Sequence, residues 1–170
     1  MQLTTNRRAQ TGSGLIESLI SIMVVSVGFL GFAGLQINGL TAANDSLFRS
    51  KAVYLSYQLA DRVRANLPAA GTGAYNDFTS QTPPSPGCTV TVNCTPAQMA
   101  SNDFAEWLTE VQSASVLPSG AGVICLDSTP DDGTPAGPAC DGQGNVLTIK
   151  VWWTEKGQAA PHRFVSTFRP

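Results

Sequence analysis

Charged residues are scarce in this sequence. Lys, Arg, Asp and Glu make up 13% of its 170 residues and leave a net charge of −2, whereas about 25% is usual for a soluble globular protein. No stretch of Lys and Arg forms the basic patch that nucleic-acid binding requires. Gly, Pro, Ser, Thr and Asn replace the missing charge, which suits a loop-rich surface outside the cytoplasm. We therefore expect no nucleic-acid partner.

Residues that carry chemistry are also few. The only histidine, His162, is expected at the surface where a strand begins. No Ser-His-Asp order, Gly-rich phosphate loop or paired-carboxylate spacing is present. The four cysteines lack the CxxC spacing of a zinc site, and Asp127, Asp131 and Asp132 lack the alternation of a calcium loop. We expect a protein that is not an enzyme and holds neither cofactor nor metal.

One long apolar segment dominates the chain. Residues 18–37 supply the roughly 20 apolar positions that a helix needs to cross a bilayer, with Ser21 and Ser26 as mildly polar interruptions before Gln36. A single carboxylate, Glu17, stands at the edge of this segment. It is either harmless at the level of the lipid headgroups, on a plain membrane anchor, or a functional site, because such a charge is costly unless it is paired.

The residues before the apolar segment favour the second interpretation. Arg7 and Arg8 form a short basic head, and Gly12 follows them. In an ordinary secretory signal the cleavage site comes after the apolar core. Here the candidate cleavage site precedes that core, so cutting after Gly12 removes the basic head and leaves the apolar segment on the mature chain.

This order of features resembles the class III signal of type IV prepilins and pseudopilins. In that family a leader peptidase cuts after a glycine, the new amino terminus is methylated, and a glutamate stands fifth in the mature chain. Gly12, Ser13 and Glu17 match these three positions, and the L-I-E sequence ending at Glu17 is similar to the family's core motif. Ser13 stands where the family most often has phenylalanine. Cutting after Gly14 instead would place the glutamate at a different spacing.

The resemblance implies roles and partners. Residues 1–12 would be the leader peptide, and Ser13 would carry the methylated amine. Glu17 would pair with its own amine or with that of a neighbour, which fixes register because a misplaced subunit leaves a buried charge unpaired. The implied partners are the prepilin peptidase and methyltransferase, an inner-membrane assembly platform, other minor pilins and the major pilin. The chain would cross the inner membrane once, with a periplasmic domain, and become extracellular in the pilus.

Three glycines recur within the apolar segment, at Gly28, Gly31 and Gly34. Small residues at such spacing allow close packing of membrane helices. They also weaken a helix, because glycine is a poor helix former, and pilin helices often carry such residues here. The two interpretations are compatible. Residues 13–40 are thus expected to form a helix half for the membrane or the filament core.

An amphipathic helix half is expected over residues 41–67. Its apolar side chains recur at helical spacing: Leu47, Phe48, Ala52, Leu55, Leu59, Val63 and Leu67. Pro68 and the small residues after it are expected to end the helix. A helix from Ser13 to Asn66 would be roughly 80 Å long.

Residues 68–170 are expected to form a periplasmic domain. After a Pro- and Gly-rich connection with Tyr75 and Phe78 as anchors, residues 88–94 read as a short strand. Thr95 and Pro96 then begin a second helix, which ends before residue 118 and presents Met99, Phe104, Trp107, Leu108 and Val111 on its apolar face.

Strands are expected at residues 121–126, 145–154 and 163–168, with a turn at 155–158. Trp152 and Trp153 would point to opposite faces, so we expect one in the core and the other free to meet a partner. The expected fold class is α+β, with a long amino-terminal helix packed on a small antiparallel sheet, which agrees with the resemblance to pilins.

Four cysteines in an exported domain suggest two disulfides, for which three pairings are possible. We favour the local pairs Cys88–Cys94 and Cys125–Cys140, because the second would staple the turn-rich loop at residues 127–144. Pilins often close a loop near the carboxyl end in this way.

Three functions remain open. The first is a minor pilin that helps to initiate, or is built into, a type IV pilus, which supports adhesion and twitching motility. The second is a minor pseudopilin of a type II secretion filament, which has the same amino-terminal signal. The third is a binding module at a filament tip, with the loop at residues 127–144 as the adhesive surface.

Overall fold

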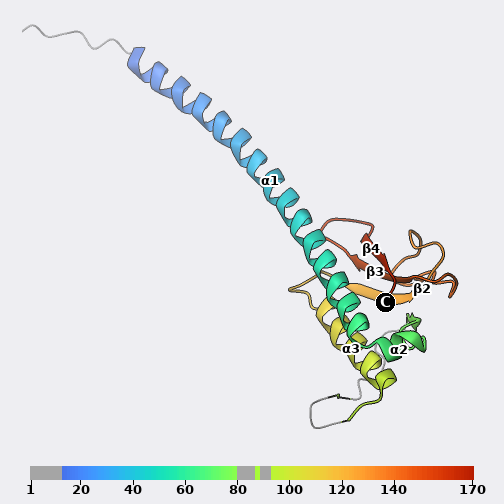
Figure 1. Cartoon of the computed structure of the whole chain (residues 1–170). Helices are drawn as coiled ribbons and strands as arrows, with labels where there is room; N and C mark the ends of the chain where they lie inside the picture. The colour runs from blue at the N-terminus through green and yellow to red at the C-terminus, as the bar shows by residue number, and fades with distance from the viewer. Residues whose placement is uncertain (1–12, 80–86, 89–92) are drawn as a thin grey trace, which may run out of the picture. The chain divides into compact units, whose positions relative to one another are not determined.

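The computed structural model describes residues 13–79, 87–88 and 93–170 and divides into two units, residues 1–44 and 45–170 (Figure 1). The predicted leader, residues 1–12, lies outside the described residues. The predicted strand at residues 88–94 also falls largely outside them. The first unit, as described, is helix alone, and the second combines helices with a sheet, so each unit is considered separately.

Helix α1 (Ser13–Ala65) begins in the first unit and continues into the second. In the first unit it runs without a break through Gly28, Gly31 and Gly34. A Cβ atom added at any of these three positions would meet nothing within 4 Å. No contact within the described residues therefore requires glycine at these three positions.

The part of α1 in the second unit packs through one face. Ala52, Leu55, Leu59 and Val63 are fully buried. Leu47, predicted on this face, is instead 49% exposed. At 100° per residue it lies about 80° around the helix from Leu55. The core-facing stripe is therefore narrower than the sequence pattern indicated.

The end of α1 differs from the prediction in a second way. The helix ends at Ala65, and Asn66 leaves the helical region with φ −115° and ψ 56°. Helix α2 (Leu67–Gly71) follows at once, with Pro68 in its first turn. Proline is tolerated there because the first turn has no partner for its N–H. Pro68 thus starts a short helix rather than ending a long one, and Leu67 lies exposed.

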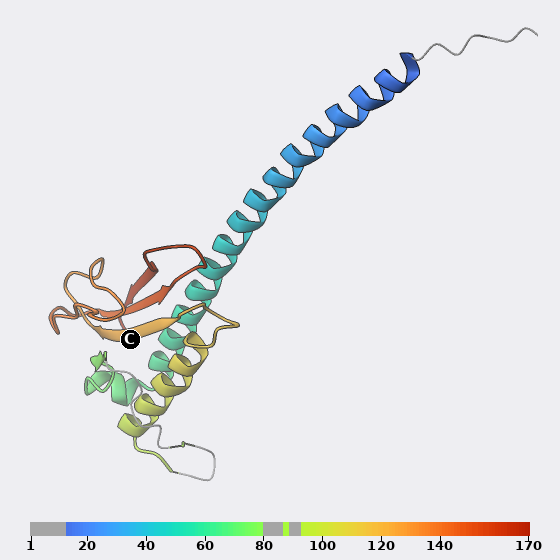
Figure 2. The same ribbon diagram turned by 180° about the vertical axis from the view of Figure 1, so that it is seen from behind.

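The sheet has four antiparallel strands in the order β1-β2-β3-β4 (Figures 1 and 2). These are β1 (Asp77–Phe78), β2 (Ala121–Leu126), β3 (Leu147–Trp153) and β4 (His162–Phe168). The long helix and this sheet make an α+β, pilin-like architecture, as predicted. Strand β1 was not predicted, because two residues are too few to show alternation.

Helix α3 (Pro96–Val111) begins with a reciprocal cap. Thr95 Oγ1 accepts a hydrogen bond from the Gln98 N–H, and Gln98 Oε1 accepts one from the Thr95 N–H at 2.9 Å. This capping box satisfies two N–H groups at the helix start. The buried face of the helix contains Ala100 in place of the predicted Met99, which is 38% exposed. Near its amino-terminal end, the buried face of α3 is therefore displaced by one residue from the predicted face.

Trp107 fixes α3 against its neighbours. Its indole N–H donates to the Leu55 carbonyl of α1 at 2.8 Å. Its ring also presses on β2, because a Cβ atom at Gly122 would lie 2.4 Å from Trp107 Cη2. Glycine at this strand position therefore lets the indole approach the backbone.

Both tryptophans of β3 are buried, which corrects the prediction that one would be free for a partner. Trp153 belongs to the main core, which includes Leu59 and Phe104. Trp152, on the other face, packs with Val123 and the disulfide-bonded Cys125. Every residue of β3 is buried, because the sheet's second face is covered by the loop at residues 127–144.

Candidate functional site

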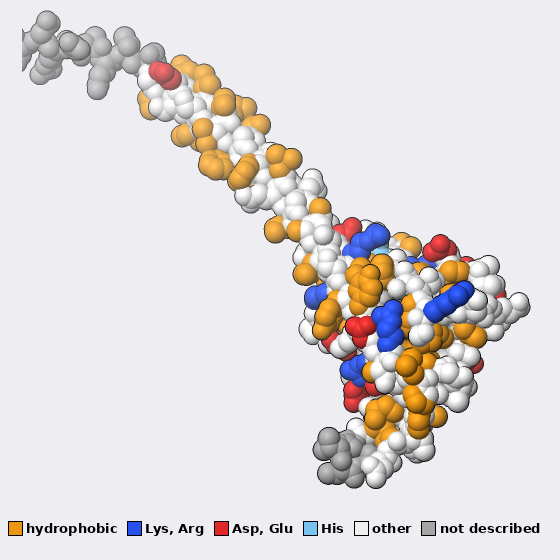
Figure 3. Space-filling view, in the orientation of Figure 1, with side chains coloured by type: hydrophobic (Ala, Val, Ile, Leu, Met, Phe, Trp, Pro, Cys, Tyr) orange, Lys and Arg blue, Asp and Glu red, His pale blue; other side chains and the backbone are white. Residues whose placement is uncertain are grey.

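The first candidate site is the apolar part of α1, residues 14–40. Every residue of this stretch is exposed, and hydrophobic side chains gather along it (Figure 3). Helix residues Gly14–Ala65 include an 18-residue window with mean hydropathy 2.2, long and apolar enough by length and composition to cross a membrane. An exposed apolar surface of this length suits lipid or contact with other helices.

The serines of this stretch need no outside partner. Ser18 donates to the Gly14 carbonyl at 2.8 Å, Ser21 to the Glu17 carbonyl at 2.7 Å, and Ser26 to the Ile22 carbonyl at 2.7 Å. Each hydroxyl is thus satisfied within its own helix, where lipid offers no hydrogen bonds. Among the side chains of residues 17–35, the Glu17 carboxylate is therefore the one polar group that the helix itself does not satisfy.

Glu17 is exposed one turn from the start of the described helix. No cation of the described residues pairs with its carboxylate. A carboxylate in an apolar setting is several kcal/mol unfavourable unless a positive charge meets it. In such a setting a partner for this carboxylate would come from the amino terminus, from another molecule or from the headgroup region. Of the other two residues of the predicted cleavage motif, Gly12 lies outside the described residues and Ser13 is described only as the first residue of α1.

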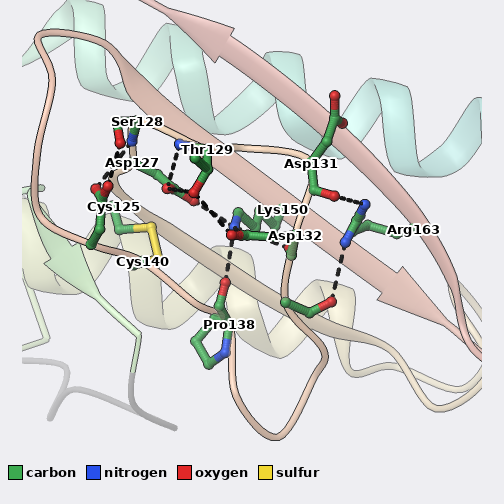
Figure 4. A network of polar contacts seen from close by, with 12 residues as sticks. Cys125, Asp127, Ser128, Thr129, Asp131, Asp132, Pro138, Cys140, Lys150 and Arg163 are labelled. Atoms are coloured by element: carbon green, nitrogen blue, oxygen red, sulfur yellow. Dashed lines mark hydrogen bonds and ion pairs between the residues drawn. A yellow bond between two sulfur atoms is a disulfide. The ribbon is translucent and has the colours of Figure 1, made fainter.

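The second candidate site is the loop at residues 127–144, between β2 and β3. A disulfide joins Cys125 of β2 to Cys140 of the loop, with Cα atoms 6.1 Å apart, and a second joins Cys88 to Cys94. These are the two local pairs. The Cys125–Cys140 disulfide closes the loop back onto β2 (Figure 4).

Lys150 of β3 is the centre of a buried polar network beneath the loop (Figure 4). Its side chain is fully buried, and its ammonium lies 2.5 Å from Asp127 Oδ2 and 2.9 Å from Asp132 Oδ1. It also donates to the carbonyls of Asp132 at 3.1 Å and Pro138 at 2.9 Å. Asp127 Oδ2 has no other partner among the described residues, so Lys150 alone balances this fully buried carboxylate.

The two ends of the loop are held as well. The Asp127 carboxylate accepts a hydrogen bond from the Thr129 N–H at 3.0 Å, and Asp141 accepts from both the N–H and the hydroxyl of Ser128. Arg163 of β4 donates to the carbonyl of Gly133 at 3.1 Å and to that of Asp131. The loop is therefore fixed along its length to β3 and β4.

The pKa shifts of two carboxyl groups in the loop agree with this arrangement. Hydrogen bonding to the Lys150 ammonium lowers the pKa of Asp132 below its usual range. The Ser128 hydroxyl and backbone N–H groups lower the pKa of Asp141. Both carboxyls are thus stabilised as anions. The buried charges of the network are engaged with one another, which fits a structural role in holding the loop.

The sequence reasoning missed Lys150. It identified Asp127 and Asp132 only as turn residues that lack a calcium pattern. A signal was present, because Lys150 is the one charge in the predicted strand at residues 145–154, whose other side chains are mostly apolar. A lysine is rarely buried unless it is paired, so its partners had to come from a segment covering that strand.

The comparison with protein families points to one class of protein. A family model described as Tt1218-like, type IV pilin Tt1218, matches residues 34–105. This stretch is similar to type IV pilins, which supports a type IV pilin. No curated protein and no solved structure matches the chain.

The pilin match and the amino-terminal signal come from different residues. The matched stretch runs from within α1 into α3 and contains neither Gly12 nor Glu17. The resemblance noted above rested on those residues. Two independent parts of the chain therefore support a pilin subunit. Its apolar amino-terminal helix fits both membrane anchoring and assembly with other pilins.

Proposed function

We propose that this pilin is a minor subunit of a type IV pilus, which helps to initiate the filament or is built into it. The observation that carries the proposal is the combination of pilin sequence at residues 34–105 with an exposed apolar helix that holds one carboxylate, Glu17. Its leader and apolar core also resemble the type IV pilus modification protein PilV. Support of adhesion and twitching motility would follow from its place in the filament.

The proposed mechanism follows from the properties of α1. In the inner membrane, residues 14–40 anchor the chain, and the domain that follows lies in the periplasm. Cleavage between Gly12 and Ser13 by the prepilin peptidase creates an amine, and its methylation keeps the positive charge. As the helix leaves lipid and enters the filament core, Glu17 meets this charge on its own chain or on a neighbour. A wrong register leaves the charges unpaired, at a cost of several kcal/mol.

The glycines of α1 suit this transfer. Gly28, Gly31 and Gly34 each cost about 1 kcal/mol of helix stability relative to alanine. They are part of a continuous helix in the free chain. We propose that this stretch weakens its helix or packs closely against neighbouring helices when the subunit enters the filament. The assembly platform, the major pilin and other minor pilins are the proposed partners in this step.

A deletion separates a pilus subunit from a secretion pseudopilin. Removing the gene should reduce the number of surface pili and twitching at least severalfold, while the amount of secreted exoproteins stays unchanged. Complementation with the full-length chain should restore both pilus phenotypes. The measurement is sheared-filament yield beside exoprotein activity in the medium. Loss of secretion with normal piliation would assign the chain to a type II secretion filament instead.

A further inference from the structure

Three potential metal ligands meet beside Trp153, which lies on the opposite face of β3 from Lys150. They are Asp45 of α1, Glu155 of the β3–β4 turn and His162, the first residue of β4. One ligand atom from each lies within 4.8 Å of the other two. All three residues belong to the second unit, residues 45–170.

His162, which the sequence places at the surface, is exposed in part. About a third of its side chain is exposed, but its Nε2 atom is buried and has no hydrogen-bond partner among the described residues. This atom lies 3.9 Å from Asp45 Oδ1 and 3.9 Å from Glu155 Oε1. A buried ring nitrogen without a hydrogen bond is unfavourable, so a group that binds this atom would stabilise the domain.

The distances fit a metal ion better than a direct ion pair. A protonated imidazole bonds a carboxylate at about 2.7–2.9 Å, which is far shorter than 3.9 Å. Zinc binds nitrogen and oxygen ligands at about 2.0–2.2 Å, which places tetrahedral ligand atoms roughly 3.4 Å apart. A shift of about half an ångström between ligand atoms, within the reach of small side-chain rotations, would complete the site.

The surroundings orient these ligands. The Trp153 ring stacks on the imidazole of His162, with centroids 5.5 Å apart and planes 17° from parallel. Its indole N–H donates to Glu155 Oε1 at 3.3 Å. Contacts of this kind hold the ligands of metal sites in place. Burial, and then the neighbouring Asp45 carboxyl, raise the pKa of Glu155, because two carboxylates without a cation repel each other.

We propose that His162 Nε2 and the carboxylates of Asp45 and Glu155 bind a divalent transition-metal ion of the zinc class. One imidazole and two carboxylates leave a fourth position for water or for a ligand from another subunit. The ion would neutralise the two carboxylates and join α1 to the β3–β4 turn. It would thereby fix the domain at the point where α1 enters it.

The test uses the full-length chain in detergent micelles, purified through a tag without histidine. Because His162 is the only histidine, its imidazole resonances report on the site without overlap. We expect Zn²⁺ to shift these resonances at a stoichiometry of one per chain and to raise the melting temperature. Co²⁺ should give visible d–d absorption, whereas Mg²⁺ at the same concentration should not displace it.

Isosteric variants identify the ligands. We expect Zn²⁺ binding to weaken at least tenfold in each of Asp45→Asn, Glu155→Gln and His162→Gln. Removing even a residue that only hydrogen-bonds a metal ligand typically weakens metal binding about 10–100-fold. Glu110→Gln, which removes a carboxylate of α3 outside the cluster, should bind as wild type does. Circular dichroism checks that each variant folds.

The wild-type spectra keep the proposal falsifiable if a variant fails to fold. Imidazole resonances that do not move with saturating Zn²⁺ would overturn it. So would binding that the three variants leave unchanged, since the ion would then sit elsewhere on the chain. Neither result bears on the pilus assignment, which rests on α1 and the family match.

Discussion

Lys150→Met should lower the free energy of unfolding by about 3–5 kcal/mol, the usual loss when one partner of a buried ion pair is removed. Methionine keeps most of the apolar stem of lysine, but the fully buried Asp127 carboxylate loses its cation. Guanidinium unfolding of the oxidised full-length chain measures the change through tryptophan fluorescence. Trp107, Trp152 and Trp153 are all buried, so their emission follows the sheet domain.

Two further variants show that the loss arises from the unpaired carboxylate. Lys51→Met removes a lysine whose ammonium donates to the Ser115 carbonyl at the surface and should cost about 1 kcal/mol or less. Asp127→Asn combined with Lys150→Met removes the buried charge while an amide oxygen can still accept from Thr129. This double variant should recover more than half of the loss. A single variant within about 1 kcal/mol of wild type would contradict the central role of Lys150.

Glu17→Ala should reduce the amount of the chain in sheared filaments at least tenfold, while its amount in the membrane stays the same. Alanine preserves the apolar helix and so the anchor, but it removes the charge proposed to set register. An unpaired amine in the filament core costs several kcal/mol, and each 1.4 kcal/mol is a factor of ten in an equilibrium. Immunoblots of the filament and membrane fractions give the ratio directly.

Ser21→Ala is the matched control, because it lies one turn further along the same helix. Its hydroxyl is satisfied by the Glu17 carbonyl within the helix, so its removal should leave the filament-to-membrane ratio unchanged. Equal incorporation of Glu17→Ala and wild type would mean that the carboxylate is a bystander at the headgroup level. The helix would then act in assembly through its apolar surface alone.

The regular elements could be predicted where one physical signal dominates. The apolar run, the amphipathic repeat and the alternating strand at residues 145–154 each have a clear period. The Thr95 cap, with Pro96 after it, marks the start of α3. Errors occurred at the edges of these signals. Leu47 and Met99 lie just off the buried faces, and Pro68 begins a new turn of helix instead of ending one.

The contacts between distant segments could not be predicted. Lys150 pairs with Asp127 and Asp132 of the loop, and which loop residues reach a strand depends on how the loop folds back. The same holds for His162 and Asp45, which are 117 positions apart in the sequence and lie close together only because β4 and α1 belong to one domain. Three cysteine pairings were compatible with the sequence, and the structure contains the two local pairs.

The leader cleavage is the step on which the pilus account depends most. Intact mass and amino-terminal sequencing of the membrane-extracted chain, from cells with and without the prepilin peptidase, measure it directly. The account predicts a mature terminus at Ser13 with the mass of one added methyl group when the peptidase is present, and the uncut chain when it is absent. A terminus still at Met1 in the presence of the peptidase would contradict it and leave α1 as an ordinary membrane anchor.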